Sequence, residues 1–276
     1  MAVIGTNISS LRASNAATKA DMMLKQSMER LSTGKRINSA KDDAAGLAIA
    51  ASMTAQIKGM NQGIRNANDG VSMAQTAEGA LDEVSNMLQR MRELAVQKAN
   101  GTYSTSDASN ITLEQDALAK QISSVISNTT FNGIKLFDGT GGSGGTVTIQ
   151  AGAASTDAIS LDLGADLAAT GSGGVGDVVT STGVTTTATL QNYDDAIATV
   201  ANRRAKLGAA QNQLESQVNQ LTSNATNLSD ARSRIEDVDF SSETTALAKA
   251  QILSQASTAM LAQANQSQQG VLQLLR

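Results

Sequence analysis

The chain has 276 residues, enough for one or two domains with a sizeable core. It contains no Cys, His, Trp or Pro, and its formal net charge is −4. Without Cys or His, disulfides, thiolate chemistry and Ser-His or Cys-His triads are excluded, and the commonest zinc, copper and haem ligands are missing. The negative charge argues against nucleic-acid binding. Carboxylate or lysine chemistry remains open, but we expect a protein that is not an enzyme and needs no cofactor or metal.

The chain shows no stretch that predicts membrane insertion, because its purely apolar runs are only a few residues long. Its first ten residues, MAVIGTNISS, lack the basic and apolar regions of a secretory signal peptide. The sequence therefore predicts a chain that either stays in the cytoplasm or leaves by a route that reads no cleavable signal.

Small apolar residues recur at helical spacing near the start and predict a helix over residues 8–31. Thr33-Gly34 interrupts this helix. A second helical region is expected to begin at Asn38 or Ser39, where Asp42 stands three residues after Ser39 as in a capping box. The stripe of the first helix is Ala13, Ala17, Ala20, Leu24, Met28 and Leu31.

The second helix contains Asn68-Asp69-Gly70, a composition typical of a turn. The apolar stripe stays in phase across these residues, so we predict one continuous helix to about residue 99. A shorter helix is expected after Asn100-Gly101-Thr102, closed by Asn132-Gly133. Its predicted apolar face is Ile111, Leu118, Ile122 and Val125.

Composition changes sharply in residues 138–189, which hold 12 of the 23 Gly, five Asp, and no Lys, Arg or Glu. Within this insert, residues 146–151 and 159–163 alternate apolar and polar side chains and predict a β-hairpin. The surrounding Gly, Ser and Thr runs predict surface loops without much core.

Residues 190–235 keep an unbroken three-four spacing that is typical of one long helix, about 69 Å at the α-helical rise. A helix of this length with a narrow apolar seam must lie along other helices, which predicts a rod. The seam positions are Leu190, Tyr193, Ile197, Val200, Arg204, Leu207, Gln211, Leu214, Val218, Leu221, Ala225, Leu228, Arg232 and Ile235.

The last helical segment, about 242–276, has few charged residues and seven Gln from Gln251 to Gln273. Its predicted stripe is Ala246, Ala250, Leu253, Ala256, Met260 and Ala264. An Ala-rich face returns little burial free energy against the entropy of ordering the backbone. We therefore expect both ends of the chain to be largely disordered alone and to become helical when packed among copies.

Long strings at both ends carry a family resemblance. They are LSTGKRINSAKDDAAGLAIA (31–50), LQRMRELAVQKANGT (88–102), TTFNGIKLFDG (129–139), ARSRIEDVDFSSET (231–244) and AQANQSQQGVLQLLR (262–276). With these strings, residues 1–138 and 190–276 resemble a bacterial flagellin with a small central variable region. The resemblance implies a filament subunit for swimming motility, located outside the cell in the flagellum.

The resemblance also implies an organisation and a set of partners. The expected fold is mainly α, a long antiparallel helical rod or coiled-coil bundle with a small hairpin-containing insert. Residues 1–40 and 237–276 would form an inner-tube coiled coil, 41–137 and 190–236 the rod helices, and 138–189 a variable surface region. Besides copies of itself, the implied partners are a flagellar export chaperone, the type III export gate that passes the unfolded chain, and the hook–filament junction and cap proteins.

Two sets of candidate site residues follow. The residues expected to pack the filament are Leu11, Leu24, Leu31, Leu47, Leu81, Leu88, Leu214, Leu221, Leu228, Leu253, Leu261, Leu272 and Leu275. The string QRxRELAV, shared by flagellins that the vertebrate Toll-like receptor for flagellin detects, stands at residues 89–96. The resemblance implies receptor contacts at Gln89, Arg90, Leu94 and Glu114, although Leu94 could instead pack the bundle.

An alternative function is a flagellin-like binding protein at the cell surface. In that case the central insert would be displayed to hold glycans or host molecules, and the affinity would map to residues 140–189.

Overall fold

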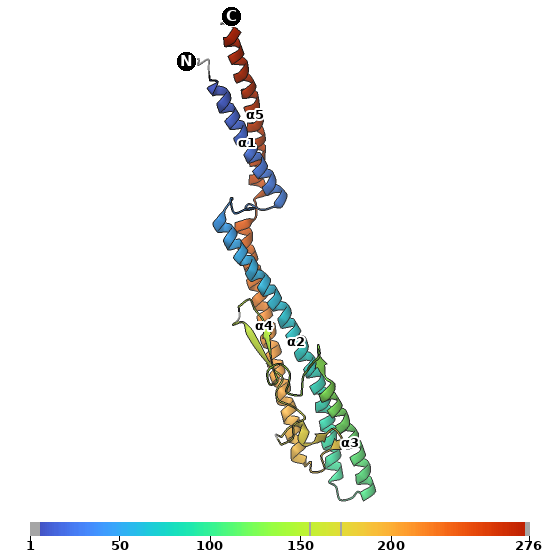
Figure 1. Ribbon diagram of the computed structural model, residues 1–276. Coiled ribbons are helices and arrows are strands. Elements are labelled where there is room, and N and C mark those ends of the chain that lie inside the picture. The colour runs from blue at the N-terminus through green and yellow to red at the C-terminus, as the bar shows by residue number, and fades with distance from the viewer. Residues whose placement is uncertain (1–5, 155, 172, 274–276) are drawn as a thin grey trace. The chain divides into compact units, whose positions relative to one another are not determined.

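The computed structural model describes residues 6–154, 156–171 and 173–273, with only the backbone described from 268 onward (Figure 1). Two compact units are present: Met1–Ala55 with Asn227–Arg276, and Gln56–Thr226. We call them the terminal unit and the central unit. Across the described residues, five α-helices and three small antiparallel strand pairs confirm the predicted mainly α fold with a small β component.

In the terminal unit, helices α1 (Ile8–Thr33) and α5 (Phe240–Gln273) lie side by side and run in opposite directions (Figure 1). The helix predicted near the start of the chain is thereby confirmed. Asn7 caps α1, because its side-chain oxygen accepts a hydrogen bond from the Ser10 N–H at 3.0 Å. Gly34 ends α1 with a left-handed φ of 72°, a conformation that glycine adopts without a Cβ penalty.

The two segments next to these helices pair with each other. The Arg36 N–H donates to the Glu236 carbonyl at 2.6 Å, and the Val238 N–H donates to the Gly34 carbonyl at 3.0 Å. These bonds satisfy backbone groups that would otherwise be left unpaired where the helices end.

The predicted helix start at Asn38 or Ser39 is wrong. The Asp42 carboxylate accepts hydrogen bonds from the backbone N–H and hydroxyl of Ser39, which stabilises a turn rather than a helix start. The backbone bond from Ser39 also lowers the pKa of Asp42. Helix α2 begins at Ala44, and Asp43 provides its cap by accepting the Gly46 N–H at 2.9 Å.

Helix α2 runs without a break from Ala44 to Lys98, which confirms the predicted continuity across residues 68–70. Two of its glycines, Gly63 and Gly70, allow close packing and do not form a turn. A Cβ at Gly63 would lie 2.8 Å from the Ala151 carbonyl, and one at Gly70 would collide with the Ile149 side chain. Glycine in α2 therefore lets the β-hairpin of the insert approach the helix backbone.

Helix α3 (Thr105–Asn128) starts with a capping box, in which the Ser104 hydroxyl accepts the Asp107 N–H and the Asp107 carboxylate accepts the Ser104 N–H. Its buried face contains Ile111 and Ile122 as predicted. Leu118 and Val125 are half-buried at the border of that face.

A short hairpin of β1 (Thr130–Phe131) and β2 (Ile134–Lys135) follows α3. Asn132 and Gly133 form its turn, with φ values of 49° and 81°. Positive φ at both central residues is what a tight two-residue hairpin turn requires. The prediction that this dipeptide closes the helix is therefore wrong, because α3 ends before the hairpin begins.

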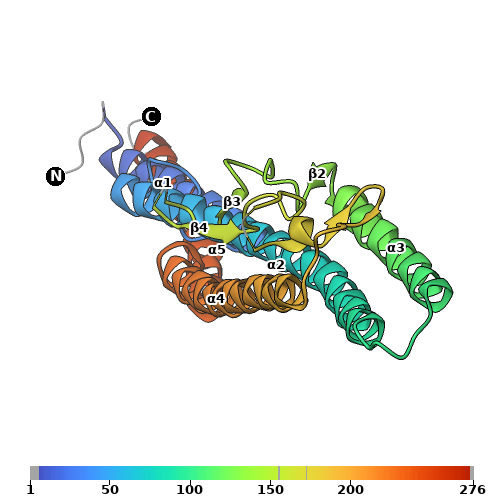
Figure 2. The same ribbon diagram turned by 90° about the horizontal axis from the view of Figure 1, so that it is seen from below.

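The central insert contains the predicted hairpin, with β3 (Thr146–Gln150) antiparallel to β4 (Ala158–Asp162). A 3₁₀ turn (Val175–Asp177) and the pair of β5 (Val179–Thr180) and β6 (Gly183–Val184) follow. Figure 2 shows the β3–β4 hairpin lying over α2.

The core of the central unit joins α2, α3, α4 and the insert. From the helices it includes Ala74, Ala77, Leu81, Val84, Leu88, Met91, Ala119, Ile122, Tyr193, Val200, Leu207 and Leu214. Phe137, just before the insert, also belongs to this core, and from the insert it includes Ile149, Leu161, Leu163, Leu167, Val175 and Val178. The expectation of loops without much core is therefore wrong, because the insert supplies one wall of the core.

Helix α4 (Leu190–Glu236) confirms the one long helix predicted from the three-four spacing, although Leu190 of the predicted seam is 40% exposed. Seam residues Tyr193, Val200, Leu207, Leu214 and Leu221 are buried at strict seven-residue intervals. This period keeps one face of a long helix against its neighbours.

Candidate assembly interface

The pairing of α1 with α5 buries a narrow seam of small residues. On α5 the buried positions Glu243, Ala250, Ser257 and Ala264 are spaced by seven. The stripe predicted for this segment is therefore rotated from the true seam: Ala246, Leu253, Ala256 and Met260 are exposed. On α1, Ala20 and Ser27 are buried, whereas Met28 of the predicted stripe is exposed.

Three polar contacts cross this seam. The Asn7 side-chain amide donates to the Ala264 carbonyl at 3.1 Å, and the Ser254 hydroxyl donates to the Asp21 carboxylate at 3.0 Å. The Arg30 guanidinium lies 3.7 Å from the Glu243 carboxylate.

Large apolar side chains of α1 and α5 remain exposed outside this seam. They are Ile8, Leu11, Met22, Met23, Met28, Phe240, Ile252, Leu253 and Met260. Large apolar side chains gathered on an exposed surface can mark an interaction site. These two helices thus offer a second apolar surface that pairing within one chain leaves uncovered.

The expected filament-packing residues fall into three groups. Leu81, Leu88, Leu214 and Leu221 are buried inside a single chain. Leu24, Leu31, Leu47, Leu228 and Leu261 are half-buried, and Leu11 and Leu253 are exposed. The Leu272 side chain and all of Leu275 lie outside the described residues.

The prediction missed Met22, Ile252 and Met260 as candidate contact residues, and Met260 was assigned to the seam. Their signal was present in the sequence: each is a large apolar residue on a helix of mostly small and uncharged side chains. Only one stripe was predicted on each helix, whereas a helix that packs on two sides needs two.

The residues implied as receptor contacts surround an exposed ion-pair cluster on α2 and α3. The Arg90 guanidinium contacts the carboxylates of Glu114 at 2.9 Å and Glu93 at 3.2 Å, and hydrogen bonding to Glu114 is the main cause of its raised pKa. Gln89 is exposed beside them. Leu94 is only 2% exposed, so it packs inside the central unit.

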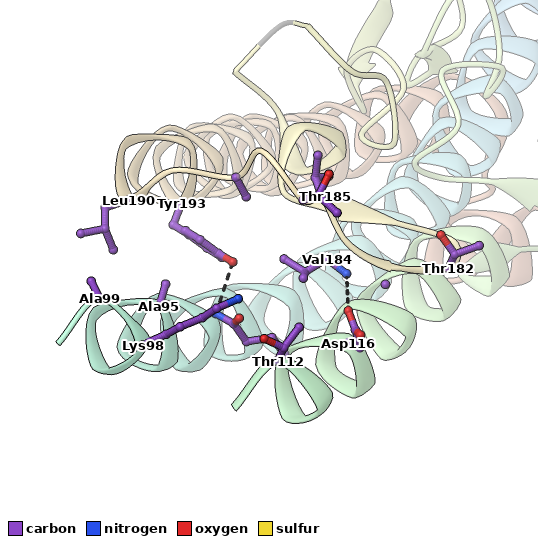
Figure 3. Close-up of a pocket in the computed structure, with 14 residues that line it drawn as sticks. Ala95, Lys98, Ala99, Thr112, Asp116, Thr182, Val184, Thr185, Leu190 and Tyr193 are labelled. Carbon is purple, nitrogen blue, oxygen red and sulfur yellow. Dashed lines mark hydrogen bonds between the residues drawn. The ribbon is translucent and has the colours of Figure 1, made fainter. Parts of the chain in front are cut away.

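A cavity of about 600 Å³ lies between α2, α3, β6 and the start of α4 (Figure 3). The Gln115 amide at its wall donates to the Met91 carbonyl at 3.1 Å and to the Tyr193 hydroxyl at 3.5 Å. Asp116 accepts the Val184 N–H at 2.9 Å, and burial raises the pKa of Tyr193. These bonds tie β6 of the insert to α3, and α3 to α2 and α4.

Among the residues that the structure describes, no group of three or more His, Cys, Asp or Glu side chains could hold a metal ion. No helix in the described part of the chain has the length and apolar character that a membrane span requires.

Long paired helices with large apolar side chains exposed outside their seam are typical of a structural protein that associates with copies of itself. Family models agree with this class: the bacterial flagellin N-terminal helical region matches residues 4–141, and the C-terminal helical region matches residues 190–275. The chain belongs to the bacterial flagellin family, which is a family of structural proteins and not of enzymes.

Individual relatives match over most of the chain. A flagellin of Halalkalibacterium halodurans is 46% identical over 252 residues, which cover 91% of both chains. A flagellin of Bacillus subtilis is 43% identical and covers 99% of both chains. A Treponema phagedenis protein named flagellar filament 33 kDa core protein is 39% identical over 99% of this chain and 100% of its own.

Among solved structures, Bacillus cereus flagellin is 34% identical, with a TM-score of 0.49. The match covers 61% of this chain and 94% of that one.

Proposed function

We propose that this chain is the subunit of a bacterial flagellar filament outside the cell, and that copies pack through the outward-facing apolar residues of α1 and α5. The observation that carries the packing mode is the exposure of Met22, Ile252 and Met260 on helices whose seam is already filled. Burial of such residues by neighbouring copies is the main favourable term in association. The name of the Treponema phagedenis relative supports the filament assignment.

The test is electron microscopy of the purified chain after a precipitating salt is added. Tubular filaments are expected from the full chain, and none from a chain that lacks residues 257–276. Ile252→Ser should prevent assembly, whereas Leu113→Ser, an exposed leucine on α3, should not. Assembly of the Ile252→Ser chain at the wild-type rate would contradict this packing mode.

We further propose that residues 1–40 and 237–276 form the inner layer of the filament, residues 41–137 and 190–236 the surrounding rod, and residues 138–189 its outer surface. In this proposal the inner segments are largely disordered in the free subunit, since their seam consists of small residues that bury little surface. Amide hydrogen exchange on the free subunit tests this. Strong protection in residues 6–30 and 245–270 would contradict it.

The proposal includes export of the unfolded chain with a chaperone through the type III gate, and assembly between junction and cap proteins. A chain without Cys or Pro suits this route, because disulfide formation and prolyl isomerisation cannot slow its refolding. Co-purification of the chain with the chaperone from cells that lack the export gate would test this step.

For the Toll-like receptor, we propose contacts at Gln89, Arg90 and Glu114, with Leu94 supporting them from inside the central unit. Arg90→Ala should reduce the response of receptor-bearing reporter cells, and Lys58→Ala should not. An unchanged response to Arg90→Ala would contradict the proposed contact.

No observation supports the alternative of an insert that displays a binding site. The larger apolar side chains of the insert, including Ile149, Leu161 and Leu167, are buried in the core of the central unit. Little apolar surface is left on the insert to bind glycans or host molecules.

A further inference from the structure

Methionine is distributed unevenly over the two units. The chain has ten Met and no Cys, Trp or His. Met73 and Met91 are buried in the core of the central unit, at 4% and 0% exposure, and Met53, Met60 and Met87 are half-buried. The four that are exposed among the described residues all lie on α1 and α5, with exposed fractions from 45% to 62%: Met22, Met23, Met28 and Met260. We call these four the exposed methionines.

The exposed methionines of α1 surround its seam on several sides. Successive residues of an α-helix are about 100° apart around its axis. The buried line of α1 passes through Ala20 and Ser27. Met23 and Met28 therefore lie on opposite flanks of that line, and Met22 faces away from it. A neighbouring copy that packs against α1 from any of these sides contacts a thioether.

Two of the exposed methionines line hollows of the terminal unit. Met260 lines a groove of about 380 Å³ together with Ala16 of α1 and Ala256 of α5 among others. Met23 lines a cavity of about 270 Å³ together with Ala246 of α5 and other residues. The flexible thioether side chain adapts to irregular contact surfaces, so Met is well suited to contact another copy at such places.

A thioether reacts with a peroxide without help from other side chains. The sulfur lone pair attacks one oxygen of the peroxide, the O–O bond breaks, and that oxygen becomes bonded to sulfur. The proton of the attacked O–H group passes to the departing oxygen, so hydrogen peroxide leaves as water and an organic hydroperoxide as an alcohol. Sulfur is oxidised by two electrons and the peroxide is reduced by two. The product, methionine sulfoxide, is polar, and methionine sulfoxide reductases return it to Met.

Access to the sulfur atom sets the order in which the methionines react. Because the chain lacks Cys, a peroxide has no thiol to oxidise first. Met73 and Met91 can react only when the central unit opens locally. The exposed methionines can react in the free subunit whether α1 and α5 are paired or disordered. A peroxide should therefore modify the candidate assembly interface while the central unit stays folded.

We propose that the exposed methionines form a peroxide-sensitive modification site, and that their oxidation prevents a free subunit from entering a filament. The consequence for assembly rests on the proposed function, in which neighbouring copies bury this surface. A sulfoxide oxygen would have to be desolvated there, and the apolar area whose burial favours association would be smaller. In a filament the same packing covers the thioethers, so oxidation acts on the free subunit and spares the assembled one.

Peptide mass spectrometry after brief treatment with hydrogen peroxide tests the order of reaction in the full-length free subunit. We expect each exposed methionine to be oxidised roughly tenfold faster or more than Met73 and Met91, because reaction of the buried pair waits for local opening. In filaments assembled before treatment, the exposed methionines should react roughly tenfold more slowly than in the free subunit, because their sulfur atoms are covered. Equal rates for exposed and buried residues, or for free and assembled subunits, would overturn the proposal.

Substitution by leucine tests the consequence for assembly, at the peroxide dose that oxidises the exposed methionines of the wild-type chain. The treated wild-type chain should form at most about a tenth of the filaments of the untreated chain when precipitating salt is added. The variant with Met22→Leu, Met23→Leu, Met28→Leu and Met260→Leu should assemble equally well before and after treatment. Loss of assembly in that treated variant, or full assembly of the treated wild-type chain, would overturn the proposal.

Met73→Leu with Met91→Leu is the matched control, because it removes two buried thioethers with little change in core volume. After peroxide treatment this control should lose assembly as the wild-type chain does. Retained assembly would show that the buried thioethers carry the effect, and would overturn the proposal.

Enzymatic reduction covers the case in which the variant with four leucine substitutions does not assemble even untreated. The treated wild-type chain is incubated with methionine sulfoxide reductases for both sulfoxide epimers until mass spectrometry finds the exposed methionines reduced. Assembly should then return, and its absence would overturn the proposal. If the untreated wild-type chain formed no filaments, the proposed function would fail, whereas the order of oxidation in the free subunit would still decide whether these residues are the peroxide-sensitive site.

Discussion

Arg203 of α4 donates a guanidinium hydrogen bond to the backbone carbonyl of Leu163 in the insert, with a nitrogen–oxygen distance of 3.0 Å. A second bond reaches the Ala165 carbonyl, and Gly164 between them, at a φ of 82°, leaves room for the guanidinium group. Burial lowers the pKa of Arg203, against the opposing effect of Asp162. One side chain of the long helix thus holds the turn that follows β4.

Arg203→Met keeps most of the aliphatic stem and removes both bonds. We expect the free energy of unfolding to fall by about 2 kcal/mol, the usual size for a lost hydrogen bond to a charged group. Urea denaturation followed by circular dichroism measures it. Lys206→Met is the control, because its exposed 2.9 Å pair with Asp162 should contribute less than about 1 kcal/mol. Equal losses in both variants would contradict a specific anchoring role for Arg203.

Two glycines of α2 should respond to alanine in opposite directions. A Cβ at Gly63 would lie 2.8 Å from the Ala151 backbone, whereas one at Gly79 would meet nothing within 4 Å. Gly79→Ala should raise the free energy of unfolding by about 1 kcal/mol through helix propensity. Gly63→Ala should lower it by about 1–2 kcal/mol, because overpacking outweighs that gain. Stabilisation by both substitutions would show that the hairpin does not pack closely on α2.

Leu214 and Leu221 test the long seam of α4, since both are buried there. Leu214→Asp or Leu221→Asp would place a charge in an apolar core and should cost several kcal/mol of stability. Filament formation should be lost in both variants, and Lys58→Ala, at an exposed position of α2, should matter far less. A wild-type thermal unfolding temperature in either aspartate variant would refute burial of the seam.

The capping box of α3 should make part of the stability depend on pH. Hydrogen bonds from Ser104, first from its side chain and then from its backbone, lower the pKa of Asp107 below its ordinary value of 3.8. Ionised Asp107 therefore stabilises the fold above that value, and this contribution is lost as the pH falls through the lowered pKa.

Asp107→Asn should accordingly be less stable than wild type at about pH 7 and approach wild-type stability at about pH 2. Thermal unfolding at the two pH values measures the difference. Asp69→Asn is the control, because the structure gives Asp69 no hydrogen bond or ion pair within the described residues. The same pH dependence in both variants would contradict a role for the capping box.

Much of the fold was predictable where a local pattern decides the structure. The seven-residue recurrence of Tyr193, Val200 and Leu207 indicated the buried face of α4, because a helix keeps residues seven apart on one side. The alternation in residues 146–151 and 159–163 indicated the hairpin, because a β-strand places successive side chains on opposite faces. Neither inference needed any knowledge of what the element packs against.

The candidate interface was harder to predict. The spacing of apolar residues shows which positions of a helix are hydrophobic, but not which neighbouring element they contact. In the last helix, Met260 was assigned to the seam because it continues the helical spacing of that stripe. The structure buries Ser257 instead, since α1 approaches closely enough for small residues to fill the space. A small polar residue in a tight seam and a large apolar residue outside it both run against the usual pattern.

The amino-acid sequence by itself determined the helices, the hairpin, the missing catalytic chemistry and the family, since each depends on local spacing or on strings that stand together in the chain. Only the tertiary structure decided that the Gly-rich insert forms a wall of the core, that Gly63 lets the Ala151 backbone approach α2, and that Arg30 faces Glu243. Those relationships join residues far apart in sequence, and their free energy comes from contacts that exist only once the chain has folded.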